Sequence, residues 1–239
     1  PQLTVETGAT DRVVNYTSGS GTTVLTFNYT VQTGDTSSDL DYVATTSLAL
    51  NAGTIRDAAL NDATLTLATP GAAGSLAANE AIVIDTTAPT ASVTTATIAN
   101  TGNATVQSTE TGTAYLVKST ITVTNVASIT GASVTSWNEV TIVTANLDTS
   151  LAATGLVDGS YKAYAVDAAG NLSAASTNTV TIDTTGPVVT GVDSSTAAGS
   201  YKVGDVISIQ VTFDETVTVV GTPQLTVETG ATDRVVNYT

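Results

Sequence analysis

The chain has 239 residues and contains no cysteine, methionine or histidine. Without cysteine it cannot form disulfides or cysteine-ligated zinc sites, and without histidine it lacks the commonest general base and metal ligand. Its 21 acidic and 6 basic residues give a net charge of −15, which disfavours nucleic acid and anionic membranes as partners and favours hard divalent cations.

The apolar residues predict the fold class. Hydrophobic residues make up 41% of the chain, but only two Phe and one Trp are among them, and β-branched Val, Ile and Thr are common. β-Branched side chains fit pleated sheets and lose conformational freedom in helices. No stretch shows sustained helical periodicity, and no apolar run approaches the thickness of a bilayer. We therefore predict an all-β chain that does not insert into membranes.

One segment occurs twice. Residues 1–17, with the sequence PQLTVETGATDRVVNYT, recur letter for letter as residues 223–239, an offset of 222 positions. Sequence duplication explains identity of this length, whereas no structural requirement does. We therefore expect the chain to be a window from a long tandem array, in which its partners are neighbouring repeats of the same protein.

Two similar segments divide the chain into modules, AIVIDTTAP at residues 81–89 and TVTIDTTGP at residues 179–187. Proline cannot donate to a sheet ladder and keeps the residue before it extended, so each segment is predicted to be a last strand followed by a short linker. Residues 89–186 then form one complete module. Residues 1–88 are the C-terminal part of a second module type, and residues 187–239 are the N-terminal part of its next copy.

Short β-branched runs between turn residues predict the strands. In chain order they are residues 12–16, 23–31, 47–50, 81–84, 91–98, 104–108, 113–118, 139–145, 150–156, 161–166, 177–182, 206–213 and 224–228. About seven short strands in a module of about 100 residues predict an immunoglobulin-like sandwich without its disulfide. We expect tandem modules of this kind in an extended array.

Acidic residues fall at the ends of these predicted strands. Asp167 and Asn171 bound a loop, DAAGN, after one strand, and Glu110 lies between two others. In such a sandwich both loops lie at the end where the chain arrives, and the preceding module delivers Asp85 there. Carboxylate and amide oxygens suit calcium, which takes six to eight oxygen ligands, and without a cation the crowded charges would repel. We therefore predict a calcium site at this junction.

The next junction has the same composition. Asp183 leaves the complete module, Asp214 and Glu215 lie in the following one, and Asp57 and Asn61 bound the corresponding loop, DAALN. A second calcium site is predicted where copies of these residues meet. At both junctions the alternative is that the residues only form turns on a solvated surface.

A polar loop offers a second kind of site. Asp35, Asp39 and Asp41 could wrap an ion within one module, or they could form an aspartate-rich turn. The spacing lacks the central glycine and distal glutamate of an EF-hand loop. Both interpretations stay open at this point.

Two stretches resemble a known class of protein. Residues 161–187, YKAYAVDAAGNLSAASTNTVTIDTTGP, are similar to the closing segment of the tandem immunoglobulin-like (Big-type) repeats of bacterial giant surface adhesins, including RTX-type biofilm adhesins. Residues 201–215 joined to residues 15–67, which include YTSGSGTTVLTFNYTVQTGDTSSDLDY, resemble another repeat type of the same class of large secreted proteins. The resemblance implies stalk modules stiffened by calcium and displayed on the bacterial cell surface. Leu60 departs from the loop pattern, which has glycine at Gly170, so a left-handed turn at Leu60 would be strained.

These observations favour a structural extender that projects a distant binding domain or builds a surface fibre. The alternative is direct binding of carbohydrate or ice. An enzyme is not expected, because the acidic residues are predicted at module junctions rather than in one cleft. Separate molecules could also share strands head to tail and form filaments.

Overall fold

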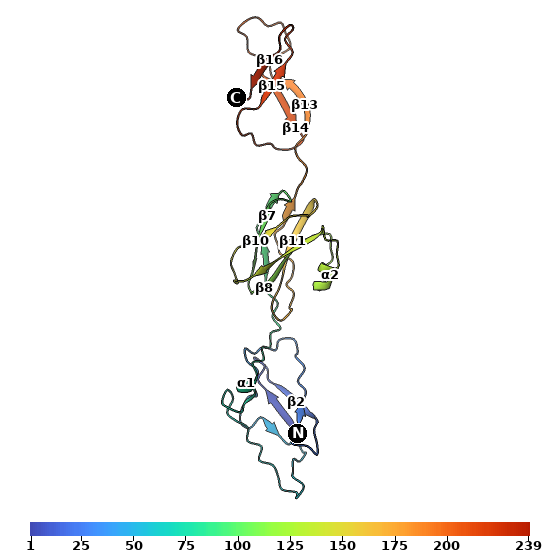
Figure 1. Cartoon of the computed structure of the whole chain (residues 1–239), viewed down its shortest axis with the longest axis vertical. Coiled ribbons are helices and arrows are strands. Elements are labelled where there is room, and N and C mark those ends of the chain that lie inside the picture. Colours follow the sequence, from blue (N-terminus) through green and yellow to red (C-terminus); the bar gives the residue numbers. More distant parts are fainter. The chain divides into compact units, whose positions relative to one another are not determined.

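The structure is a computed structural model that describes all 239 residues, and it is built almost entirely of β-strands. The only helices are single turns, α1 (Leu76–Asn79) and α2 (Val126–Thr130). This confirms the predicted all-β class. The chain divides into two units, Pro1–Asp183 and Thr184–Thr239, close to the predicted module boundary at residue 186 (Figure 1). Each unit is described by itself.

Residues 1–88 form one small sheet with the strand order β3-β2-β1-β4. Its strands are β1 (Gln2–Val5), β2 (Arg12–Ser18), β3 (Thr26–Phe27) and β4 (Leu48–Ala49). The buried residues of its core are Val5, Val14, Leu40 and Ile84. The predicted strand 23–31 is mostly unpaired, since only residues 26 and 27 join β2. The predicted strand 81–84 pairs only through the bridge of Ile84 to Ser37 and a hydrogen bond from the N–H of Leu40 to the carbonyl oxygen of Ile82.

Residues 91–182 form two sheets with the orders β10-β7-β5 and β6-β12-β11-β8-β9. The strands are β5 (Ala91–Val93), β6 (Ala96–Ile98), β7 (Asn103–Ser108), β8 (Gly112–Lys118), β9 (Trp137–Ile142), β10 (Thr149–Ala152), β11 (Gly159–Val166) and β12 (Val180–Ile182). The strand predicted at 91–98 is divided between the sheets, because β5 pairs with β7 and β6 runs parallel to β12.

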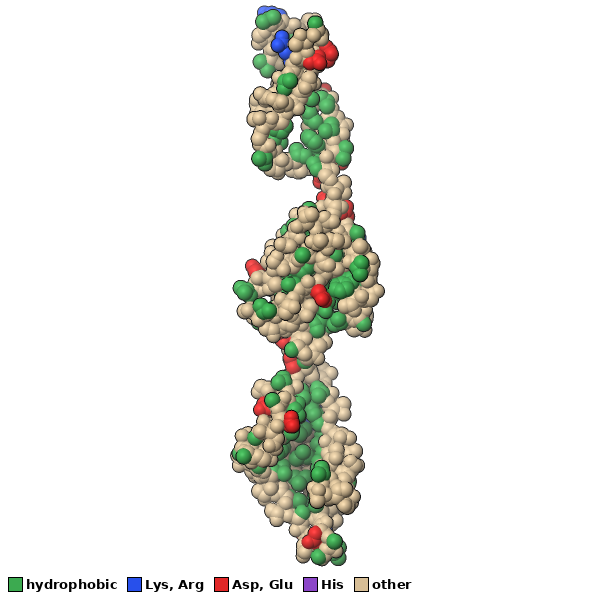
Figure 2. Space-filling view, viewed as in Figure 1, with side chains coloured by type: hydrophobic (Ala, Val, Ile, Leu, Met, Phe, Trp, Pro, Cys, Tyr) green, Lys and Arg blue, Asp and Glu red, His purple; other side chains and the backbone are tan.

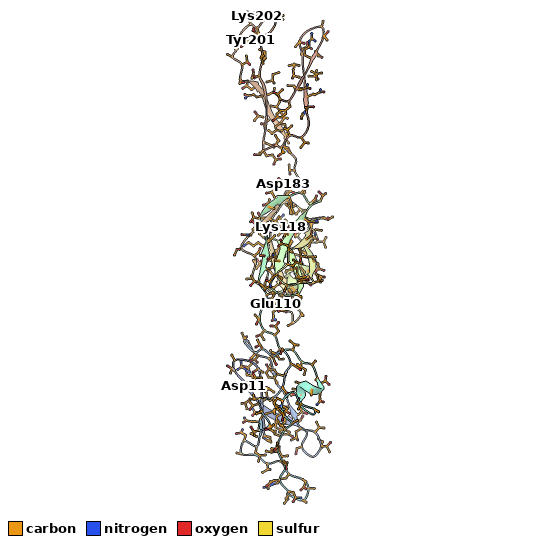
Figure 3. The ribbon with its side chains drawn as sticks, turned by 90° about the vertical axis from the view of Figure 1, so that its left-hand side faces the viewer. Asp11, Glu110, Lys118, Asp183, Tyr201 and Lys202 are labelled. Carbon is orange, nitrogen blue, oxygen red and sulfur yellow. The ribbon has the colours of Figure 1, made fainter.

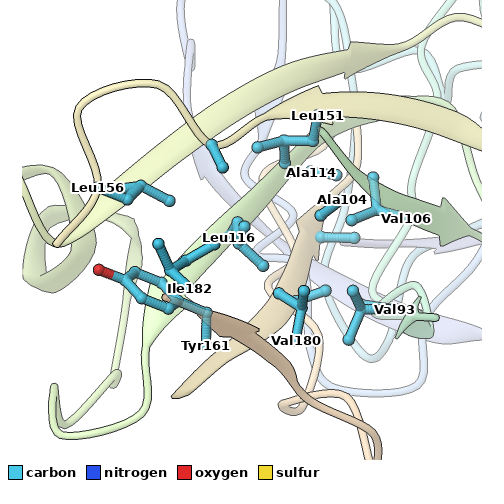
Figure 4. Close-up of a cluster of buried hydrophobic side chains, with 14 of the residues drawn as sticks. Val93, Ala104, Val106, Ala114, Leu116, Leu151, Leu156, Tyr161, Val180 and Ile182 are labelled. Carbon is cyan, nitrogen blue, oxygen red and sulfur yellow. The ribbon is translucent and has the colours of Figure 1, made fainter. Parts of the chain in front are cut away.

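One apolar core joins the two sheets. Along β11, Tyr161, Ala163 and Ala165 are buried and alternate with partly exposed residues, as predicted for a half-buried strand. They pack with residues of the opposite sheet, including Val106 and Leu151 (Figure 4). Full burial of each aliphatic side chain contributes about 1.5–3 kcal/mol, so this core holds the sheets together.

The strand β8 is buried on both faces, which explains why four consecutive residues, 114–117, are buried. Ala114 and Leu116 face the core between the sheets, whereas Tyr115 and Val117 pack against Ile129 of α2. A capping box at Asn125 starts this helix. The single helical turn therefore closes the outer face of the larger sheet.

The second unit consists of two separate hairpins. They are β13 (Val189–Ser194) with β14 (Ile209–Phe213), and β15 (Gln224–Val227) with β16 (Arg234–Asn237). None of the residues 184–239 is buried, and many of the apolar side chains are exposed (Figure 2). This unit therefore has no core of its own, and an isolated two-stranded hairpin is at best marginally stable in water.

Candidate metal centre

Three carboxylates from distant parts of the sequence converge in the first unit. One oxygen from each of Asp85, Glu110 and Asp167 lies within 4.8 Å of the others. Asp167 is only 7% exposed, and the other two are half-buried. The sequence predicted this convergence from the positions of the three residues at strand ends.

Each acid is placed by a different segment. Asp85 follows Ile84 in the linker between the two cores, Glu110 lies in the turn between β7 and β8, and Asp167 directly follows β11. Figure 3 shows Glu110 at one end of the two-sheet body, whereas Asp183 is at the opposite end. The three carboxylates therefore mark the end of this body at which the chain arrives.

A close backbone contact brings the turn of Glu110 to the end of β11. Gly112 has a φ of 146°, and a Cβ atom at this position would lie 2.0 Å from the carbonyl oxygen of Val166. Only glycine can occupy this position without moving one of the two strands. In the same turn, the backbone N–H of Glu110 donates to the hydroxyl of Ser108 over 3.2 Å.

Asn171 connects the two sides of the site. Its side-chain amide donates to Asp167 Oδ2 over 2.8 Å and to the backbone carbonyl oxygen of Asp85 over 3.1 Å. Its backbone N–H donates to Asp167 Oδ1 over 2.9 Å. Asp85 Oδ1 accepts from the backbone N–H of Thr87. Asn171, the predicted fourth member of the site, therefore lies beside the triad, where its amide nitrogen holds the Asp167 carboxylate next to the backbone of Asp85.

The electrostatics of the site favour a cation. Burial raises the pKa of Glu110 above its ordinary value, and the negative charges of Asp85 and Asp167 raise it further. None of the three carboxylates forms an ion pair with lysine or arginine. Carboxylate oxygens gathered at this spacing suit a hard divalent cation such as calcium or magnesium. The residues present therefore fit the predicted ion.

The corresponding loop in residues 1–88 has the same hydrogen bonds. Asp57 Oδ1 accepts from the backbone N–H of Asn61 over 2.8 Å, and Asp57 Oδ2 accepts from its amide over 2.8 Å. Leu60 has a φ of 70°, so it adopts the strained left-handed conformation that glycine adopts at Gly170 in the other loop. This loop belongs to no group of three acids, and the carboxylate that follows it, Asp62, forms an ion pair with Arg56.

The residues of the second predicted junction belong to different units. Asp183 lies in the first unit, where its backbone N–H donates to the carbonyl oxygen of Ile98. In the second unit Asp214 Oδ1 accepts from the backbone N–H of Val188 over 2.8 Å, and Glu215 is exposed. A calcium site formed by these residues stays a prediction.

The loop with Asp35, Asp39 and Asp41 requires a correction. Asp35 is 1% exposed and forms an ion pair with Arg12 over 2.6 Å, and it also accepts a hydrogen bond from the hydroxyl of Tyr29. The carboxylate of Asp41 instead accepts from the backbone of residues 42, 71 and 76. Asp39 is exposed. The three acids do not converge on one site, because two of them serve the fold of residues 1–88.

Sequence reasoning missed the network of Arg12, Tyr29 and Asp35. The hydrogen bond from Arg12 lowers the pKa of Asp35 to about 2, and burial together with the hydrogen bond to Asp35 raises the pKa of Tyr29 to about 12. The one available signal was Arg12 itself, one of only six basic residues in a chain with 21 acidic ones, but its partner lies 23 positions away and cannot be read from the local sequence.

Neither α1 nor α2 is long enough to cross a membrane. Comparison with known protein families, with curated proteins and with solved structures finds no match for this chain.

Proposed function

We propose that the chain is a structural extender, a calcium-stiffened segment of the stalk or fibre of a large secreted bacterial surface protein that serves adhesion or biofilm formation. Its modules are immunoglobulin-like sandwiches in tandem, and it is not an enzyme. The observation that carries the proposal is the convergence of Asp85, Glu110 and Asp167, because the acids come from the two sides of a module boundary.

A shared ion would stiffen the connection between the two modules. Residues 1–88 and residues 91–182 have separate cores, and the only covalent connection between them is the short linker after Asp85. A cation held by Asp85 on one side and by Glu110 and Asp167 on the other would restrict rotation about that linker. Calcium is millimolar outside cells, which matches the weak affinities of extracellular calcium modules.

The duplication supports the same role. A module that repeats with letter-for-letter identity over 17 residues adds length rather than a new chemical site, and adding length is what an extender requires. The strongly acidic composition and the lack of histidine and cysteine are compatible with calcium as the structural ion.

Calcium titration of the whole chain by calorimetry tests the proposal. Asp167→Asn removes one charge from the triad, and Asp57→Asn makes the same change in a loop with the same aspartate–asparagine hydrogen bonds that belongs to no group of three acids. We expect Asp167→Asn to weaken calcium binding by at least about tenfold and Asp57→Asn to leave it unchanged. Absence of calcium binding by the unmodified chain, or equal affinities of the two variants, would contradict the proposed site.

Small-angle X-ray scattering tests the mechanical role separately. We expect the largest dimension of the chain to be well defined in calcium and to become broadly distributed when a chelator removes the ion. An identical distribution in both conditions would mean that the ion does not stiffen the joint.

A further inference from the structure

The module of residues 89–186 has a direct connection between its beginning and its end. β6 runs parallel to the last strand, β12, and the two are paired over residues 96–98 and 180–182. The backbone N–H of Asp183 continues this ladder and donates to the carbonyl oxygen of Ile98 over 3.0 Å. All other strand pairs of the structure are antiparallel. Two segments from opposite ends of the module's sequence therefore lie side by side.

β6 is held in place mainly by this pairing. It lies at the edge of its sheet, and β12 is its one neighbour there. Ala96 and Thr97 are exposed, and of the three residues only Ile98 packs against the apolar core. The strand before it, β5, pairs instead with β7, which is an internal strand of the module, so that contact does not join the two ends. The link between the ends therefore depends on the backbone of β6.

The pair is oriented along the line between the two ends of the module. The backbone N–H of Thr90 donates to the hydroxyl of Thr109 over 2.8 Å, so the chain enters beside the turn of Glu110. It leaves after Asp183, at the opposite end of the two-sheet body (Figure 3). β12 runs towards this exit, and β6 is parallel to it. Tension on the chain therefore pulls β6 back towards the entry and β12 towards the exit, so that the two strands must slide past each other.

Sliding strains all hydrogen bonds of the pair at once. Hydrogen bonds between strands lie across the strands. A pull along the strands therefore acts on all of them together, whereas a pull that separates the strands sideways breaks them one after another. Because β6 and β12 join the two ends directly, residues 99–179 carry no tension until this pair has broken.

We propose that the pair of β6 and β12 is a mechanical clamp, which passes tension from one end of the module to the other and shields residues 99–179 from it. The shielded residues include β7 to β11 and most of the apolar core between the two sheets. The use of the clamp rests on the proposed role as an extender. Its strength needs no ion, so a test in chelator can fail without affecting the calcium site, and the calcium site can fail without affecting the clamp.

Pulling single molecules of the whole chain in two directions, in chelator, tests the clamp. The chain has no cysteine, so engineered cysteines give unique attachment points. Ala88→Cys with Gly186→Cys, both at exposed positions, pulls the two ends of the module apart. Ala88→Cys with Val143→Cys pulls within the entry end, because Val143 is 80% exposed and follows Ile142, the partner of Gly112.

We expect a higher unfolding force in the first direction than in the second. In the first direction, a single step should release roughly 300 Å of chain, at about 3.3–3.6 Å per residue. Both attachments are made in the same folded module with the same core, so a difference in force reports the direction of loading. An equal or lower force in the first direction overturns the inference.

A matched pair of proline variants tests the hydrogen bonds of the clamp. The carbonyl oxygen of Ile98 accepts from Asp183, so the backbone groups of Ile98 face β12. The direction alternates along a strand, so those of Ala96 also face β12 and those of Thr97 face the open edge. Ala96→Pro therefore removes a donor from the clamp, whereas Thr97→Pro removes one that has no partner strand. Both side chains are exposed, so neither change disturbs the core.

The two variants should differ only when the ends of the module are pulled apart. At constant force in that direction, we expect Ala96→Pro to unfold at least about fivefold faster than the unmodified chain, and Thr97→Pro to stay within about twofold of it. In the second direction the two variants should unfold at the same rate. Equal rates of the two variants in the first direction overturn the inference. The comparison of directions needs neither variant, so it decides the matter even if Ala96→Pro does not fold.

Discussion

Replacing Glu110 by glutamine is expected to change stability in opposite directions with and without a divalent cation. Without the cation, Glu110 lies among two other negative charges, and removing its charge relieves their repulsion. With the cation, the same change removes a ligand. The amide of glutamine has nearly the size of the carboxylate, so packing contributes little to either effect.

The size of the effect follows from the geometry. Two unit charges 4.8 Å apart repel by about 1 kcal/mol in water and by about 3.5 kcal/mol at an effective dielectric constant of about 20. Glu110 and Asp85 are half-exposed, so the lower part of this range applies. Loss of the two repulsions should therefore stabilise the calcium-free variant by about 1–2 kcal/mol.

Calcium should reverse the order of stability of the unmodified chain and the Glu110→Gln variant. At a calcium concentration of 100 times Kd, binding stabilises the folded chain by about 2.7 kcal/mol, whereas a variant that binds a hundredfold more weakly gains about 0.4 kcal/mol. Urea unfolding followed by circular dichroism, in chelator and in calcium, measures both differences. Glu80→Gln, an exposed site near the linker, serves as the control. If Glu110→Gln is less stable than the control in chelator, or gains as much from calcium as the unmodified chain, the reasoning about the triad is wrong.

Two further predictions concern residues 1–88 and the paired loops. The pKa of Asp35 is lowered to about 2 by the hydrogen bond from Arg12, so its contribution to stability is complete above its unfolded pKa of about 3.9 and is lost as the pH falls towards 2; Asp35→Asn should remove this step from the melting temperature measured against pH. Leu60→Gly should stabilise the chain by up to about 1 kcal/mol, because Leu60 is 73% exposed and its left-handed backbone is unfavourable for a residue with a Cβ atom. Gly170→Leu should destabilise the chain by about 1–2 kcal/mol for the same reason. Urea unfolding measures both changes.

The features that could be predicted from the sequence are those encoded locally. Alternation along residues 161–166 predicted which side of β11 faces the core, because side chains of a strand alternate whatever its neighbours are. The loop of Asp167 was recognisable because it follows such a strand. Its approach to Glu110 then followed from the expectation that turns at one end of two stacked sheets lie close together.

The features that could not be predicted depend on contacts between distant residues. The three aspartates between residues 35 and 41 resemble an ion-binding loop by spacing alone. The first of them, Asp35, instead forms an ion pair with Arg12, which is 23 positions earlier. The division of residues 91–98 between two sheets depends on which strands lie opposite each half. Neither partner can be read from the segment itself.

The same distinction explains why residues 23–31 were predicted as a strand and remain largely unpaired. The alternation of Leu25, Phe27 and Tyr29 records a strand that evolved to pack on a core, and the half-burial of these residues shows that their inner face is in place. What the segment lacks is a neighbour along its edge, and a sequence pattern describes a strand's faces but never its edges. The alternation of residues 25, 27 and 29 therefore predicted the buried face of this segment correctly and left its pairing open. In β14 the sequence likewise marks an apolar face, Ile209, Val211 and Phe213, but does not reveal that only one edge of the strand is paired.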